Sequence, residues 1–201
     1  MSALVDILID VADLFAALFS DRGDAPAANK FQRTDMPLVQ MQDLPDDSRV
    51  WVFGADNDLG EGAADLMLRE VDRFLADWHA HGSPLTSARD WRYNRFLTIA
   101  VDQSTAGASG CSIDGLFRSL KALQPRLGAS LVTSGLIFYR DKKGRVQSVD
   151  REGFTALGDE ITPKTKVFDP TVTTLGEWRA RFELNAEDSW HARLIGQKQP
   201  A

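Results

Sequence analysis

The 201-residue sequence has little of what builds metal and disulfide sites, since it holds one cysteine and three histidines. One cysteine cannot form an internal disulfide, and so few residues cannot supply the clustered ligands of a structural zinc site. The scarcity predicts that no metal is bound. It also favours a reducing, cytoplasmic location.

Basic charge is also short: 23 Lys and Arg stand against 29 Asp and Glu, for a net charge of −6. Residues 1–48 carry this whole imbalance, with nine aspartates against Arg22, Lys30 and Arg33. Affinity for nucleic acid comes mainly from concentrated Lys and Arg. The composition therefore excludes nucleic acid as the expected partner.

The chain has no apolar run long enough to span a membrane. The most apolar stretch, SALVDILIDVADLFAALFSD, is interrupted by Asp6, Asp10 and Asp13 and has no basic residues before it. Each central aspartate would cost about 2.5–3.5 kcal/mol in a bilayer. A span needs ~20 apolar residues, and a signal peptide needs a basic start and a small-residue cleavage site. We expect neither.

The same stretch predicts an amphipathic helix over residues 1–20, because its three aspartates fall on one narrow stripe. The candidate partner-binding residues on the apolar surface are Leu4, Leu8, Val11, Leu14, Phe15, Leu18 and Phe19. This surface either packs on its own domain or docks on another protein, at or away from a membrane surface. Lipid binding alone is disfavoured because the helix has no Lys or Arg for anionic head groups.

Residues 21–47 read as an extended strap, since they contain Pro26, Pro37 and Pro45 and little periodicity. The predicted globular domain covers residues 48–201. The helix and the strap together form an acidic N-terminal arm.

The periodicity of the remaining chain predicts alternating strands and helices. The expected strands are 48–54, 91–102, 131–140, 145–150 and 165–169, and the expected helices are 60–81, 111–127 and 151–157, followed by a helical stretch with Trp178, Phe182 and Trp190. The fold class is α/β (mixed α+β): a single domain with a mixed four- to five-stranded sheet covered by helices. We expect the five tryptophans to lie mostly in the core.

Several segments resemble an uncharacterised bacterial family often labelled "ABC transporter ATPase". They include SRVWVF, HGSPL, WRYNRFLTIAVD and ASGCSID, and the resemblance covers about residues 43–195. The arm lies outside it. The family brings no known activity, and its label implies ATP hydrolysis.

A P-loop ATPase needs G-x-x-x-x-G-K-[ST] after a strand, so that backbone amides and a lysine hold the phosphates. The segment GADNDLGEG after the first expected strand has neither that lysine nor G-x-G-x-x-G spacing. The sequence therefore predicts no ATPase activity and no cofactor.

Cys111 is the sharpest candidate for chemistry because it stands at the start of an expected helix, where the helix dipole favours a thiolate. His81 is then the candidate base, and Asp102 or Asp114 the group that orients it. The alternatives are a packed strand-to-helix turn, which the small neighbours favour, and an anion site at the helix start. His79 and His81 form an H-x-H pair, for which a position at a helix C-terminus is expected rather than a metal site.

Two functions from different classes follow. The preferred one is a non-enzymatic interaction or scaffold protein, an extrinsic cytoplasmic subunit that attaches to a larger assembly through its arm. A bacterial membrane complex is the specific expectation, with a photosynthetic reaction-centre and antenna complex as one candidate. The alternative is a small cysteine-dependent enzyme of acyl or thiol transfer with Cys111 as nucleophile.

Overall fold

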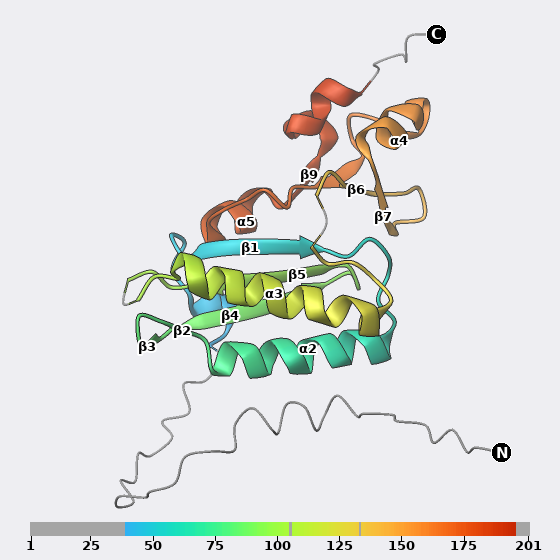
Figure 1. Ribbon diagram of the computed structural model, residues 1–201. Helices are drawn as coiled ribbons and strands as arrows, with labels where there is room; N and C mark the ends of the chain where they lie inside the picture. Colours follow the sequence, from blue (N-terminus) through green and yellow to red (C-terminus); the bar gives the residue numbers. More distant parts are fainter. Residues whose placement is uncertain (1–38, 105, 133, 196–201) are drawn as a thin grey trace, which may run out of the picture. The chain divides into compact units, whose positions relative to one another are not determined.

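The computed structural model describes residues 39–104, 106–132 and 134–195, and these all belong to one compact unit (Figure 1). The predicted helix of residues 1–20 and most of the predicted strap lie outside the described residues. From Val39 onward the strap's last part is described. It includes a short 3₁₀ helix, η1 (Met41–Asp43), and Leu44, which is buried in the core.

The centre of the unit is a three-stranded antiparallel sheet in the order β1–β5–β4. Its strands are β1 (Arg49–Gly54), β4 (Ser87–Arg92) and β5 (Phe96–Val101), and every residue of β5 is buried. Two helices, α2 (Glu61–Ala76) and α3 (Gly110–Leu127), cover one face (Figure 1). Leu97, Ile99 and Val101 point to these helices, while Phe96 and Ala100 point to the opposite face. A strand buried on both faces reads as a continuous apolar run, which FLTIAV is.

A second sheet, with the order β7–β6–β8–β9, completes the fold. Its strands are β6 (Ile137–Arg140), β7 (Val146–Val149), β8 (Lys166–Phe168) and β9 (Glu183–Asn185). Helix α5 (Leu175–Arg181) and part of this sheet cover the other face of the central sheet. Helix α4 (Arg151–Ala156) packs with two short 3₁₀ helices, η3 (Ala186–Asp188) and η4 (Trp190–Leu194), and a further one, η2 (Gly158–Glu160), follows α4 in the chain.

The predicted class, a mixed α/β domain with helix-covered strands, is confirmed. The arrangement differs in detail, because the described strands form sheets of three, four and two strands in which all pairs are antiparallel. The predicted strand 91–102 covers the end of β4, a tight turn at Tyr93 and Asn94, and β5. Both residues have positive φ, of 58° and 53°. No glycine or proline marks this turn, so the sequence pattern concealed it.

The first predicted helix is also shorter than expected. It ends at Ala76, and β2 (His79–Ala80) and β3 (Ser83–Pro84) follow as a small hairpin turning at His81 and Gly82. The prediction that His79 and His81 stand at a helix C-terminus was therefore wrong. The His-Gly pair supplies the two positive φ angles that such a hairpin requires.

Candidate functional site

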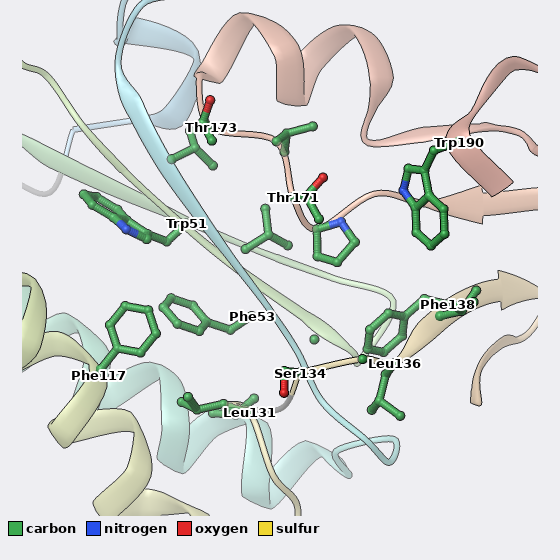
Figure 2. A pocket seen from close by; sticks show the side chains of 18 of the residues that line it. Trp51, Phe53, Phe117, Leu131, Ser134, Leu136, Phe138, Thr171, Thr173 and Trp190 are labelled. Atoms are coloured by element: carbon green, nitrogen blue, oxygen red, sulfur yellow. The ribbon is translucent and has the colours of Figure 1, made fainter. Parts of the chain in front are cut away.

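An apolar groove of about 640 Å³ runs along the outer edge of β1. We call it the edge groove. One wall comes from Phe117 of α3 and Leu131, and the other from the segment Pro170–Thr173. Figure 2 shows Thr171 and Thr173 on one side of β1, Phe117 and Leu131 on the other, and Trp190 beside Phe138 toward the far end.

Strand β1 has an open edge inside this groove. Hydrogen bonds alternate along an antiparallel pair, so every second residue of β1 directs its N–H and C=O away from β5. The Val50 N–H donates outward to Thr173 C=O at 2.9 Å, whereas the Ala55 N–H donates toward the β4–β5 turn, to Arg95 C=O at 2.7 Å. This phase places Val52 and Gly54 outward.

The outward groups of Val52 and Gly54 have no partner. In the described part of the chain, no hydrogen bond uses the N–H of either residue on that side or the C=O of Val50 and Val52. The bridge between Arg49 and Thr174, with the Leu175 N–H donating to Ser48 C=O at 2.9 Å, is the last pairing on this edge. The sheet therefore stops at β1, and along this edge Val52 is partly exposed, whereas Gly54 is buried.

The end of the groove at Gly54 is fixed by close packing. A Cβ at this glycine would lie only 2.3 Å from Cζ of Phe138, so the Phe138 ring rests directly on the Gly54 backbone. Phe138 also packs edge-on against Phe96, with ring centroids 4.9 Å apart. The second sheet thus attaches to the first through a contact that only glycine permits.

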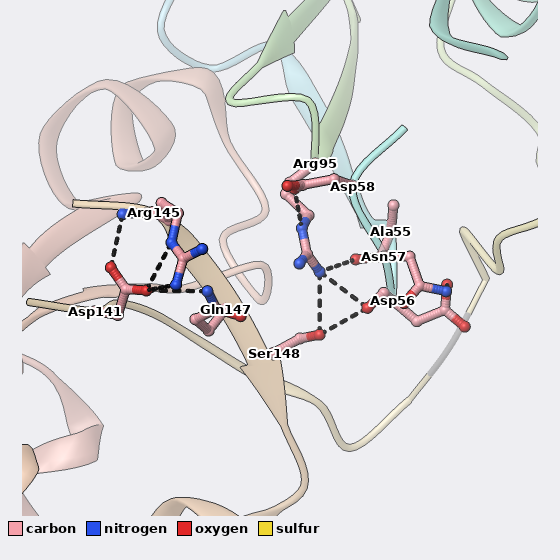
Figure 3. Close-up of polar contacts among 9 residues, drawn as sticks. All are labelled: Ala55, Asp56, Asn57, Asp58, Arg95, Asp141, Arg145, Gln147 and Ser148. Atoms are coloured by element: carbon pink, nitrogen blue, oxygen red, sulfur yellow. Dashed lines mark hydrogen bonds and ion pairs between the residues drawn. The ribbon is translucent and has the colours of Figure 1, made fainter. Parts of the chain in front are cut away.

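A buried arginine holds the loop after β1 (Figure 3). Arg95 is 6 % exposed and its Nε donates to Asp58 at 2.7 Å. Its Nη1 donates to Asp56 C=O at 2.9 Å and to Ser148 Oγ at 3.1 Å, and Ser148 Oγ in turn donates to Asp56 C=O at 2.9 Å. This network joins the β4–β5 turn, the loop after β1, and β7.

Trp190 borders the groove and is 36 % exposed, which is unusual for so large an apolar side chain. Its ring stacks on His191, with centroids 3.7 Å apart. His191 is fully buried; its Nδ1 lies 2.9 Å from Ser189 Oγ, and its Nε2 has no partner. Burial lowers the pKa of His191 to about 4, although the Asp169 carboxylate acts in the opposite direction. At neutral pH the His191 ring is therefore uncharged, and the Trp190 ring stacks on its face.

Charge in the groove is of one sign. Arg49 and Arg151 are exposed, and they are the charged residues among those that line it. The Arg49 guanidinium lies 4.8 Å from the centre of the Trp51 ring. The groove contains no carboxylate, histidine or cysteine among its lining residues. It is an apolar surface with basic margins.

The predicted chemical site lies elsewhere. Cys111 is exposed in the first turn of α3, and it lines an open depression together with His79 and His81. The Trp78 indole N–H donates to Ser112 C=O at 2.9 Å, which holds the β2–β3 hairpin beside the start of α3. The structure thus brings Cys111 and His81 to one depression, as the catalytic hypothesis requires.

Asp102 and Asp114 do not line this depression. Asp102 instead accepts a hydrogen bond of 2.8 Å from the Ser104 N–H, which closes a local turn. The small residues before Cys111 also have a structural use, because Ser109 caps α3 by accepting from the Ser112 N–H at 3.3 Å. No described hydrogen bond joins Cys111 to His81.

Sequence reasoning found Cys111 and His81 but missed the edge groove. Its lining residues come from six separate stretches of the chain, and Trp51 and Trp190 were expected to be core residues. The predicted partner-binding surface from Leu4 to Phe19 lies outside the described residues. The described residues contain no group of three or more His, Cys, Asp or Glu side chains that could hold a metal ion. None of the described helices has the length and hydropathy needed to cross a bilayer.

Comparison of the chain with protein-family models, with curated proteins and with solved structures found no match.

Proposed function

We propose that the chain is a non-enzymatic interaction protein, an extrinsic subunit that attaches to a larger protein assembly. The observation that carries this proposal is the edge groove, in which unpaired backbone groups of β1 lie between apolar walls and beside the exposed Trp190. Exposed sheet edges and apolar patches of this kind are common sites of protein association.

The chemistry of the groove supports association rather than catalysis. Its polar lining side chains are two arginines, a serine and two threonines, and among its lining residues there is no group to serve as nucleophile or general base near neutral pH. Apolar walls with a few polar groups suit the burial of another protein's side chains. These properties favour binding of another protein in the groove over catalysis.

The acidic N-terminal arm is the second attachment element of the proposal. The apolar surface of its predicted helix, from Leu4 to Phe19, would have to be buried against another surface, and its aspartates favour a protein partner over anionic lipid. The proposed assembly is a membrane complex of a bacterium, to whose cytoplasmic face this subunit attaches. Both membrane and soluble fractions are therefore relevant to the test.

Affinity purification from the native host tests this function. The full chain is compared with a chain lacking residues 1–35, which lie outside the compact unit, and with Leu136→Asp, which places a charge in the groove. Leu157→Asp is the matched control, because Leu157 is also half-buried but packs in the separate cluster around Phe154.

We expect a stoichiometric complex with the full chain and with Leu157→Asp. Deletion of residues 1–35 or Leu136→Asp should each reduce the yield of that complex at least about fivefold, since loss of 1 kcal/mol of binding energy already weakens affinity about fivefold. A full chain that elutes alone from both fractions would contradict the proposed function.

The second candidate is the cysteine-dependent enzyme, which the shared depression of Cys111 and His81 favours. In that reaction the Cys111 thiolate attacks an acyl carbon and forms a thioester, and the leaving group departs with a proton from His81. The absence of an orienting carboxylate beside His81 weighs against it. Its test is the reactivity of Cys111, described in the Discussion.

A further inference from the structure

The open edge of β1 has a defined start and length. Residues Thr173 to Leu175 pair with this edge only at Ser48 and Val50. The preceding residues, Pro170–Val172, form a wall of the groove instead of pairing. The unpaired groups then continue through Val52 to Gly54. A strand rises about 3.3 Å per residue, so this edge has room for about four residues of an extended chain.

We propose that the edge groove receives an extended segment of a partner protein, which adds to the central sheet as a strand beside β1. This inference rests on the proposed function and names the chemistry of the partner segment. Its backbone pairs with the N–H and C=O groups of Val52, the C=O of Val50 and the N–H of Gly54. Strand addition of this kind takes its affinity from main-chain hydrogen bonds and its specificity from pockets for alternate side chains.

The walls define the side chains of the segment. Alternate residues of an added strand point to opposite sides of the sheet. One side meets Phe117 and Leu131, and the other meets Val172 and Phe138. Both sides are apolar, so the central four residues of the partner segment are apolar on both faces. β-branched residues fit such a strand best.

Charge complementarity defines the flanks of the segment. Arg49 stands at the first residue of β1. Arg151 follows directly after β7, where Val149 pairs with Ile137. Ile137 precedes Phe138, whose ring rests on Gly54 at the other end of β1. The two arginines therefore lie toward opposite ends of the open edge, and no lining carboxylate opposes them. The partner segment carries Asp or Glu on both sides of its apolar centre.

Fluorescence anisotropy with synthetic peptides and the full chain tests this proposal. The probe is a fluorescein-labelled decapeptide with four central Val and Ile residues between flanking aspartates. A second probe has the same centre between lysines. A third is N-methylated at alternate central residues, which removes the pairing N–H groups without changing the protein.

We expect the aspartate-flanked probe to bind saturably and at least about tenfold more tightly than the N-methylated probe, since each lost hydrogen bond weakens binding about two- to tenfold. The lysine-flanked probe should also bind more weakly, and added salt should reduce the difference. Arg49→Gln and Arg151→Gln should each weaken the aspartate-flanked probe about two- to fivefold.

Val52→Pro is the complementary change in the protein, because it removes an outward N–H that has no partner in the sheet. It should abolish binding, while Val52→Thr keeps the N–H and retains it. Circular dichroism shows whether Val52→Pro is folded. If it is not, the N-methylated probe alone decides the outcome.

Absence of saturable binding by the aspartate-flanked probe, or equal affinity of the N-methylated probe, overturns the proposal. Two other occupants would overturn it as well. A peptide of residues 3–19 that displaces the probe would assign the groove to the chain's own arm, and concentration-dependent dimerisation that blocks the probe would assign it to a second copy. The proposed function would stand through any of these results as long as the purified complex is found.

Discussion

Gly54 is a residue at which the two sheets are in close contact, because the Phe138 ring occupies the space where a Cβ would be. We predict that Gly54→Ala lowers the free energy of unfolding by about 1–3 kcal/mol, the usual range for overpacking a core. Urea denaturation measures this. Gly62→Ala is the control: a Cβ there meets no atom within 4 Å in helix α2, so it should raise stability by up to about 1 kcal/mol. Equal effects of the two changes would contradict this view of Gly54.

Arg95 makes the second prediction at this scale. Arg95→Leu should lower the free energy of unfolding by about 2–4 kcal/mol, because the Ala55 carbonyl and the Ser148 hydroxyl lose the donor that Arg95 provides. The matched change is Arg145→Leu, shown beside it in Figure 3. Arg145 pairs with Asp141 but is largely exposed. Thermal unfolding should register a much smaller loss there, and comparable losses would show that the Arg95 network contributes little.

The partner of Arg145 is the carboxylate of Asp141, which lies in an exposed cluster at the β6–β7 turn. Partial burial would raise its pKa, but hydrogen bonds from the Arg145 backbone and side chain, from Gln147 and from Lys143 lower it to about 2. Asp141 therefore organises the β6–β7 turn and stays charged at working pH. The cluster orders a turn at the surface, whereas Arg95 joins separate elements of the core.

His191 predicts a pH dependence of stability. The unfolded chain takes up a proton below pH 6.5, whereas the folded chain resists until about pH 4, so stability is full above pH 6.5 and falls as pH drops through this window. The group accounts for roughly 3 kcal/mol of that fall. Denaturant unfolding between pH 7 and pH 4 should show a shallower pH slope for His191→Asn than for the natural chain. An unchanged slope would contradict the assignment, and His79→Asn, at an exposed position, is the control that should keep it.

At the scale of elements, the bounds of helices and strands could be predicted from the sequence where the turn residue was a glycine. The expected helix 111–127 is α3, and Gly128 closes it with φ of +65°, a conformation that glycine adopts readily. Tyr93 and Asn94 form a turn just as sharp, but neither is a residue that marks turns as strongly as glycine, and apolar residues follow at once. The prediction of one strand over 91–102 therefore missed the β4–β5 hairpin. It also missed the strand order β1–β5–β4, which places β1 at the edge of the sheet.

Helix α3 provides the element-scale prediction, since its first turn holds Cys111. If the small residues before it serve to cap the helix, as the Ser109 contact indicates, iodoacetamide should label Cys111 at no more than about three times the rate of free cysteine at neutral pH. Mass spectrometry of the native chain measures the rate. Labelling tenfold or more above free cysteine, lost in His81→Asn, would support the enzyme hypothesis and oppose our preferred function.

At the scale of the whole molecule, the candidate site could not be predicted, although most elements could. The edge groove combines β1 with residues near positions 117, 131–138, 151, 170–173 and 190. Periodicity reports which residues of an element are apolar, but it does not report which strand lies at the edge of a sheet. Trp51 and Trp190 were placed in the core by residue type alone, whereas the fold sets both at the groove.

The central claim is that β1 carries an open edge ready for a partner strand, and amide hydrogen exchange of the isolated full chain tests it most directly. Trp51 and Phe53 direct their N–H groups to β5, whereas Val52 and Gly54 direct theirs into the groove. We predict that the Val52 amide exchanges at least about a hundredfold faster than those of Trp51 and Phe53, because an unpaired edge amide opens to solvent without unfolding of the sheet. Equal protection of all three amides would show that the edge is already covered, and it would contradict the account.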